Sequence, residues 1–184
     1  MKEVFNVFKD TKKIVIVAVT AAIYAGMLIP FKPIQIIPGL TELRPASVIP
    51  VLFGVLFGPA AAWGSAIGNL IADFFGMLTL ASIFGFIGNF FFSYVAYKLW
   101  NVLVKTEIIP DAKQIGIFIF ISIISSFVCA AIVAIGVGIL KLAPAIAIFL
   151  VVFINNSIMS SVLGSILLKF LYKRIEKMGL IFKE

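Results

Sequence analysis

A few ionisable and amide side chains stand within a chain that is otherwise strongly apolar. Glu42 and Arg44 follow a proline-rich segment, and Asn69 and Asp73 are four residues apart, which predicts that they share one face of a helix. Such side chains are costly inside a membrane and are therefore functional candidates. Together they offer donors and acceptors for hydrogen bonds, so they favour a pocket that binds a polar small molecule.

Three more amides interrupt later apolar runs, namely Asn89, Asn155 and Asn156. The adjacent Asn155 and Asn156 point in different directions on a helix. We therefore expect at most one of them to face a central ligand, while the other bonds a neighbouring helix.

A simpler interpretation of the charged residues stays open. Glu42 and Arg44 would then form a structural ion pair, and Asp73 would be a spare carboxylate at the membrane border.

The composition indicates which elements must position these residues. Of 184 residues, 62% are apolar and 12% are charged, about half the charged fraction of a soluble domain. Residues 14–29, 115–140 and 143–168 contain no charge and approach or exceed the roughly 20 residues that cross a bilayer as a helix. Backbone groups in lipid must be hydrogen-bonded within their own segment, so continuous apolar runs predict helices. We expect an all-α integral membrane bundle in a single domain, residues 1–184.

Breaks at proline, glycine and charged residues predict six transmembrane helices, near residues 13–30, 44–58, 60–77, 80–104, 115–140 and 143–172. Three basic clusters flank these spans: Lys9, Lys12 and Lys13; Lys98, Lys105 and Lys113; and Lys169, Lys173, Arg174 and Lys177. Basic residues favour the cytoplasmic side. An even number of spans puts both termini on that same side, so charge and span count agree on cytoplasmic termini in a multi-pass cell (plasma) membrane protein.

Residues 30–43 form the longest connection on the predicted outer side. Pro30, Pro33, Pro38 and Gly39 disfavour a helix there and favour a fixed extended or turned lid. Glu42, Arg44 and Asp73 are expected beneath this lid.

The residues that are missing exclude several kinds of function. The chain has no histidine, the commonest general base and metal ligand, and it has no phosphate-binding loop or nucleophile elbow. Its single cysteine, Cys129, is expected in the core, so we expect no disulfide, no cofactor and no metal. The net charge of +7 comes mostly from lysines at membrane borders, which argues against a nucleic-acid partner. An intramembrane enzyme would have only Asp73 and Glu42 as candidates.

The first predicted span carries small residues at Ala18, Ala21, Ala22 and Ala25. Small residues four apart allow another helix to approach closely. The partner is either a helix of the same bundle or a separate membrane protein.

These features resemble the S components of energy-coupling factor (ECF) vitamin transporters over about residues 12–174. The resemblance rests on the alanine pairs, on the long first outer loop, and on the run from Leu52 to Asp73, which reads LFGVLFGPAAAWGSAIGNLIAD. The segments Pro33-Ile-Gln35, Leu43-Arg44-Pro-Ala-Ser and Ile67-Gly-Asn-Leu-Ile-Ala are most similar to members of the QueT type, which take up queuosine precursors.

The resemblance implies a prokaryotic substrate-binding subunit that captures a vitamin-like small molecule, such as a deazapurine, from outside. It adds Gln35 to the candidate substrate-binding residues. It also implies a membrane coupling subunit, docked on the alanines of the first span, and two cytoplasmic ATPases that drive release. The alternative is a stand-alone gradient-driven carrier or channel for a small polar solute.

Overall fold

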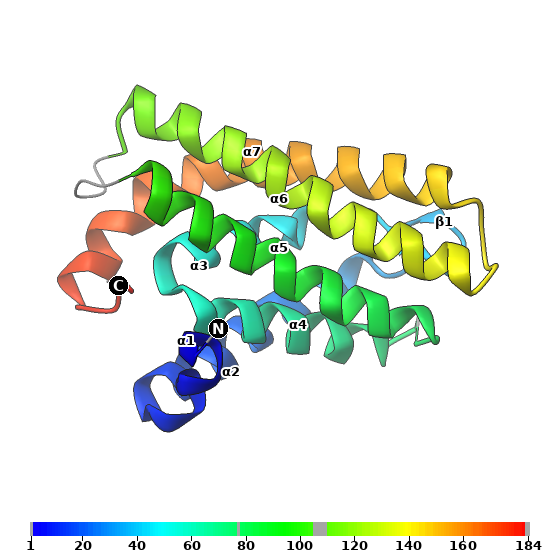
Figure 1. Cartoon of the computed structure of the whole chain (residues 1–184), viewed down its shortest axis with the longest axis horizontal. Coiled ribbons are helices and arrows are strands. Elements are labelled where there is room, and N and C mark those ends of the chain that lie inside the picture. The colour runs from blue at the N-terminus through cyan, green and yellow to red at the C-terminus, as the bar shows by residue number, and fades with distance from the viewer. Residues whose placement is uncertain (1, 77, 105–109, 183–184) are drawn as a thin grey trace.

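The computed structural model describes residues 2–76, 78–104 and 110–182 as a helical bundle with one small hairpin (Figure 1). Lys105, one of the predicted cytoplasmic lysines, lies outside these residues. The elements in chain order are α1 (Lys2–Asn6), η1 (Val7–Lys9), α2 (Thr11–Leu28), η2 (Ile29–Phe31), β1 (Gln35–Ile37), β2 (Thr41–Glu42), η3 (Pro45–Ser47), α3 (Val48–Phe57), α4 (Pro59–Asp73), α5 (Ala81–Leu103), α6 (Ala112–Ile139) and α7 (Ala145–Lys177). The prediction of a helical protein is confirmed.

Local sequence explains where several helices begin and end. Asp10 caps α2 by accepting a hydrogen bond from the backbone N–H of Lys12, and Asp111 caps α6 in the same way. Gly58 ends α3 because its φ of 61° is accessible to glycine at little cost. Pro59 then begins α4, where its missing N–H would have had no partner in the helix.

Residues 30–43, which we call the lid, begin with the end of the 3-10 helix η2 and continue as a short antiparallel hairpin. β1 pairs with β2, with Gln35 opposite Glu42 and Ile37 opposite Thr41. Gly39 has a φ of 73° in the turn between the strands. The predicted extended or turned lid is therefore present.

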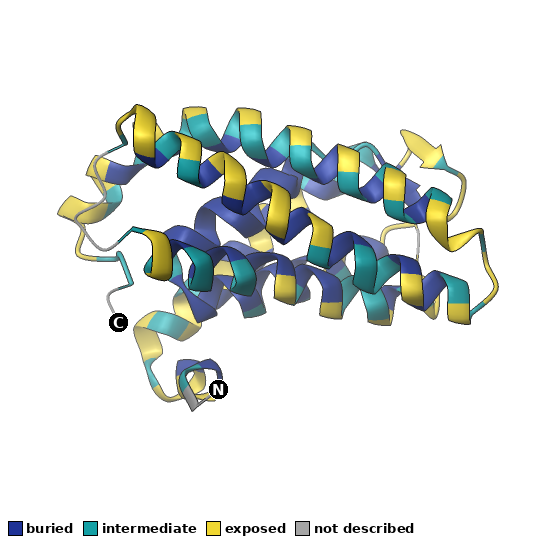
Figure 2. Ribbon diagram, turned by 45° about the horizontal axis from the view of Figure 1, so that its top comes forward, coloured by how far each residue is buried: buried dark blue, intermediate teal, exposed yellow. Residues whose placement is uncertain are grey.

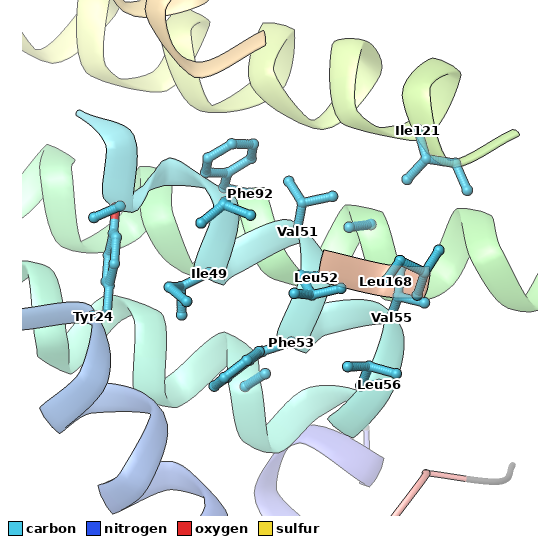
Figure 3. Close-up of a cluster of buried hydrophobic side chains, with 14 of the residues drawn as sticks. Tyr24, Ile49, Val51, Leu52, Phe53, Val55, Leu56, Phe92, Ile121 and Leu168 are labelled. Carbon is cyan, nitrogen blue, oxygen red and sulfur yellow. The ribbon is translucent and has the colours of Figure 1, made fainter. Parts of the chain in front are cut away.

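The helix α3 lies at the centre of the core. All of its residues from Val48 to Leu56 are buried, and Figure 3 shows side chains of α2, α5, α6 and α7 around it. At about 1.5 Å per residue, α3 is roughly 15 Å long, about half the thickness of the hydrocarbon core. The 15-residue α4 is also shorter than this thickness. The segments 44–58 and 60–77 are thus helical, but their helices are shorter than the predicted spans.

The outer face of α7 carries an apolar stripe. Ile154, Ile158, Val162, Ile166 and Phe170 recur every fourth residue and are all exposed, and Figure 2 shows the same pattern on the outer faces of the bundle. Water disfavours a contiguous apolar surface of this kind, whereas lipid accommodates it.

Among the described residues, three helical segments are long and apolar enough to cross a membrane, namely Thr11–Phe31, Ala112–Ile139 and Ala145–Lys177. They match the predicted first, fifth and sixth spans. The N-terminal and C-terminal parts of the described chain lie toward one end of the bundle, and the lid lies at the other (Figure 1).

Candidate functional site

The predicted polar residues meet at the lid end of the bundle, around a small cavity of about 40 Å³. Glu42 on β2, Arg44 before η3, and Asn69 and Asp73 on α4 all line it. Its remaining walls come from the lid, the α4–α5 connection, α5 and α6: Gly39, Leu40, Thr79, Ala81, Ser82, Gly85, Val133 and Val137. The volume is enough for one or two water molecules.

Arg44 is held by polar partners on α2 and α4. Its Nη2 donates to Asn69 Oδ1 at 2.5 Å and to the hydroxyl of Tyr24 at 3.2 Å. Tyr24 in turn donates to Asn89 Oδ1 at 2.6 Å. Asn89 therefore supports the site through Tyr24 and does not line the cavity. Sequence reasoning missed Tyr24, because it lies within the apolar residues of the first span and is not ionisable in the way that a carboxylate or a lysine is.

The two carboxylates share one ammonium group. Lys32 Nζ lies 2.6 Å from Asp73 Oδ1 and 3.5 Å from Glu42 Oε1. Asn69 Nδ2 donates to the other oxygen of Asp73 at 3.2 Å, so the predicted common face of these two residues is confirmed. Lys32, Glu42 and Asp73 are all buried, and with Arg44 they form a cluster whose formal charges sum to zero.

Lys32 is the residue of this cluster that sequence reasoning missed. It lies in the lid, between Phe31 and Pro33, and only 5% of its surface is exposed. It is the one lysine in residues 30–43, and a single cation in the loop before Glu42 was the feature of the sequence that could have indicated a partner for the carboxylates. The simpler interpretation of Asp73 as a spare carboxylate is wrong, because Lys32 pairs with it.

The adjacent amides of α7 hold the segment that carries Glu42 and Arg44. Asn155 Nδ2 donates to the backbone carbonyl of Glu42 at 3.0 Å, and its Oδ1 accepts from the backbone N–H of Arg44 at 3.4 Å. Asn156 Oδ1 accepts from Ser47 Oγ at 2.6 Å. Neither amide lines the cavity, so both position the chain around it.

Gln35 lies apart from this cluster. Its side chain accepts a hydrogen bond from the backbone N–H of Gly39 at 2.8 Å within the hairpin, and the residue is exposed. In this closed arrangement Gln35 shapes the lid and does not reach the cavity.

The four alanines of α2 divide between two faces. Ala21 and Ala25 are buried within the bundle, where a Cβ added to Gly68 of α4 would lie 2.7 Å from the carbonyl oxygen of Ala21. Ala18 and Ala22 are exposed. Packing within the bundle, one of the two alternatives for the small residues, therefore holds for Ala21 and Ala25, while docking of a separate membrane protein stays a prediction for Ala18 and Ala22.

Comparison with known protein families matches residues 14–173 to the QueT transporter family. No curated protein and no solved structure matches the chain. The matched residues contain the whole cavity and the lid. They also contain α3 to α6 and most of α2 and α7.

Proposed function

The chain belongs to the QueT transporter family, the S components of ECF transporters for queuosine precursors, and we propose that it captures such a compound from outside the cell. The observation that carries this proposal is the cluster of Lys32, Glu42, Arg44 and Asp73, in which two residues of the lid, Lys32 and Glu42, pair with Asp73 of α4 and with Arg44. A deazapurine offers polar ring edges and an apolar face, which suit charged groups set into apolar walls.

Ligand entry requires the lid to move. The cavity of about 40 Å³ is far smaller than the roughly 300 Å³ at the lower end of small-molecule sites. Leu40 and Gly39 of the lid form part of the cavity wall. Displacing the hairpin would enlarge the cavity and open it at the end of the bundle, without separating the long helices.

Release to the cytoplasm needs an external source of energy in this proposal. The sequence has no nucleotide-binding loop, so ATP would be hydrolysed by two cytoplasmic ATPases acting through a membrane coupling subunit. The exposed pair Ala18 and Ala22 is the surface of α2 open to such a subunit. The chain itself would be a non-catalytic, multi-pass protein of a prokaryotic plasma membrane, with six spans and both termini in the cytoplasm.

The proposal is tested by ligand binding to the purified protein alone. Protein in lipid nanodiscs should bind 7-deazaguanine derivatives tightly enough to raise its thermal unfolding temperature, and mass spectrometry should find a related compound that co-purifies. B vitamins provide the comparison set. Failure of every deazapurine, together with a strong shift by one B vitamin, would replace the substrate class.

A further inference from the structure

Two facing atoms in the site have no hydrogen-bond partner although they are buried. They are Glu42 Oε1 and Arg44 Nε, and they lie 3.7 Å apart. Glu42 is 1% exposed, and both residues line the cavity. Buried polar groups are normally paired because an unpaired one keeps its full desolvation penalty. Glu42 Oε1 is in ion-pair contact with Lys32 Nζ and Arg44 Nε but accepts no hydrogen bond, and Arg44 Nε donates none. This acceptor and this donor therefore mark a place for a polar ligand.

The neighbouring groups of the cluster are already engaged. Asn69 uses its oxygen for Arg44 and its nitrogen for Asp73, and Asp73 uses its other oxygen for Lys32. The free hydrogen-bonding capacity at this wall of the cavity is thus concentrated on Glu42 and Arg44.

Both side chains are held in orientation. The guanidinium of Arg44 is planar, and its Nη2 is fixed by Asn69 and Tyr24, so the direction of the Nε–H bond is also set. Asn155 fixes the backbone at Glu42. A pair oriented in advance discriminates between ligands better than a mobile pair does.

We infer that Glu42 Oε1 and Arg44 Nε together recognise one edge of a planar heterocycle, on which a ring N–H stands beside a carbonyl oxygen. The N–H donates to the carboxylate, and the carbonyl accepts from the guanidinium. This inference rests on the proposed function and assigns the part of the ligand that is recognised.

Lys32 makes this recognition selective for a donor. Its ammonium lies 3.5 Å from Glu42 Oε1 and forms an ion pair with this carboxylate. An ionised carboxylate only accepts hydrogen bonds. A ligand that presents an acceptor or a methyl group at this position leaves the carboxylate buried without a donor.

The test compares three probes on wild-type protein in nanodiscs by isothermal titration calorimetry. 7-Deazaguanine has the N–H and the carbonyl; 1-methyl-7-deazaguanine lacks the N–H; and 2-amino-7-deazapurine lacks both and is smaller, so it introduces no clash. We expect each altered probe to bind at least about tenfold more weakly, since one buried charged group loses its partner.

A variant separates recognition by Glu42 from simple shape. In Glu42→Gln the neutral amide can donate to the unprotonated ring nitrogen of 2-amino-7-deazapurine, so the affinity ratio between 7-deazaguanine and this smaller probe should fall severalfold below the wild-type ratio. Glu176→Gln, a carboxylate on the C-terminal part of α7 that accepts from Tyr172, should keep the full ratio.

The outcomes distinguish this inference from the proposed function. Equal binding of all three probes by wild-type protein overturns the recognised edge and leaves the substrate class intact. Binding of none overturns both. A ratio that survives in Glu42→Gln also overturns the inference, because the discrimination would then not depend on the carboxylate.

Discussion

Arg44 and Asp73 each hold two or more polar side chains around the cavity through hydrogen bonds or ion pairs, and these side chains lose a partner when either residue is replaced. Removing Arg44 frees Asn69 Oδ1 and leaves Glu42 facing only Lys32. We expect Arg44→Ala and Asp73→Ala each to lower affinity for 7-deazaguanine by about 1–3 kcal/mol, measured by calorimetry in nanodiscs. Asp73→Asn, which preserves side-chain shape, provides a second variant if the alanine variant unfolds. Unchanged affinity in both positions would place the binding site elsewhere.

We expect replacement of Lys32 to change the movement of the lid, because Lys32 lies in the lid and its partner Asp73 lies on α4. Lys32→Met removes the contact of 2.6 Å to Asp73 of α4, which connects the lid to the bundle, and the contact of 3.5 Å to Glu42 within the lid. We expect faster hydrogen exchange at the backbone amides of β1 and β2 and a higher association rate for 7-deazaguanine, both by about tenfold if roughly 1.4 kcal/mol of lid closure is lost.

The control for Lys32 is Lys141→Met, since Lys141 is an exposed lysine in the α6–α7 turn at the same end of the bundle. It should leave both rates at the wild-type value. Unchanged exchange in Lys32→Met would mean that backbone contacts alone keep the lid closed.

At the scale of elements, the two faces of α2 predict opposite consequences for similar substitutions. Ala21→Leu would overpack the contact with Gly68 of α4 and should destabilise the protein by about 1–3 kcal/mol, seen as a lower unfolding temperature. Ala22 is exposed, so Ala22→Leu should keep both stability and ligand binding. It should stop uptake in cells, because the coupling subunit would no longer approach. Normal uptake by Ala22→Leu would move the docking surface away from α2.

The short helix α1 is connected to α5 by Glu3. Its carboxylate lies 2.7 Å from Lys98 Nζ and accepts from the hydroxyls of Tyr94 and Tyr97. Partial burial raises the pKa of Glu3, but these hydrogen bonds outweigh it and lower the pKa from 4.5 to about 2. A lowered pKa stabilises the folded state above pH 4.5, and this stabilisation is lost as the pH falls toward 2.

Tryptophan fluorescence can follow this contact, because Trp63 Nε1 donates to the carbonyl of Val4 in α1. Acidification from pH 5 to pH 2 should shift the emission as α1 is released. Glu3→Gln should show the shifted emission already at pH 7, with little further pH dependence, and Trp63→Phe should remove the response. Identical spectra for wild type and Glu3→Gln at pH 7 would exclude an anchoring role for Glu3.

The sequence predicted the helices well, because long uncharged runs allow no other structure in lipid. It placed the break between the second and third spans correctly but overestimated their lengths, because residues 45–47 form the separate 3-10 helix η3 and α4 ends at Asp73. It identified Glu42, Arg44, Asn69 and Asp73 as polar residues in unusual places. It missed Lys32 because its partner Asp73 is 41 residues away, and contacts at that distance leave no local pattern.

At the scale of the whole molecule, polar groups and apolar surface are separated. The charged cluster lies at the lid end, and the termini lie toward the other end (Figure 1). A carrier that works alone needs a site that reaches both sides, usually near the middle of the membrane. A site at one end instead fits a subunit that binds its ligand and depends on partners to release it.

Uptake into proteoliposomes tests this division of labour most directly. Radiolabelled 7-deazaguanine would be offered to vesicles that contain this chain alone, and to vesicles that also contain the coupling subunit and both ATPases with ATP on the side of the ATPases. The account predicts accumulation in the complete vesicles and only stoichiometric binding by the chain alone. Accumulation by the chain alone under an ion gradient would contradict it and identify a self-sufficient carrier.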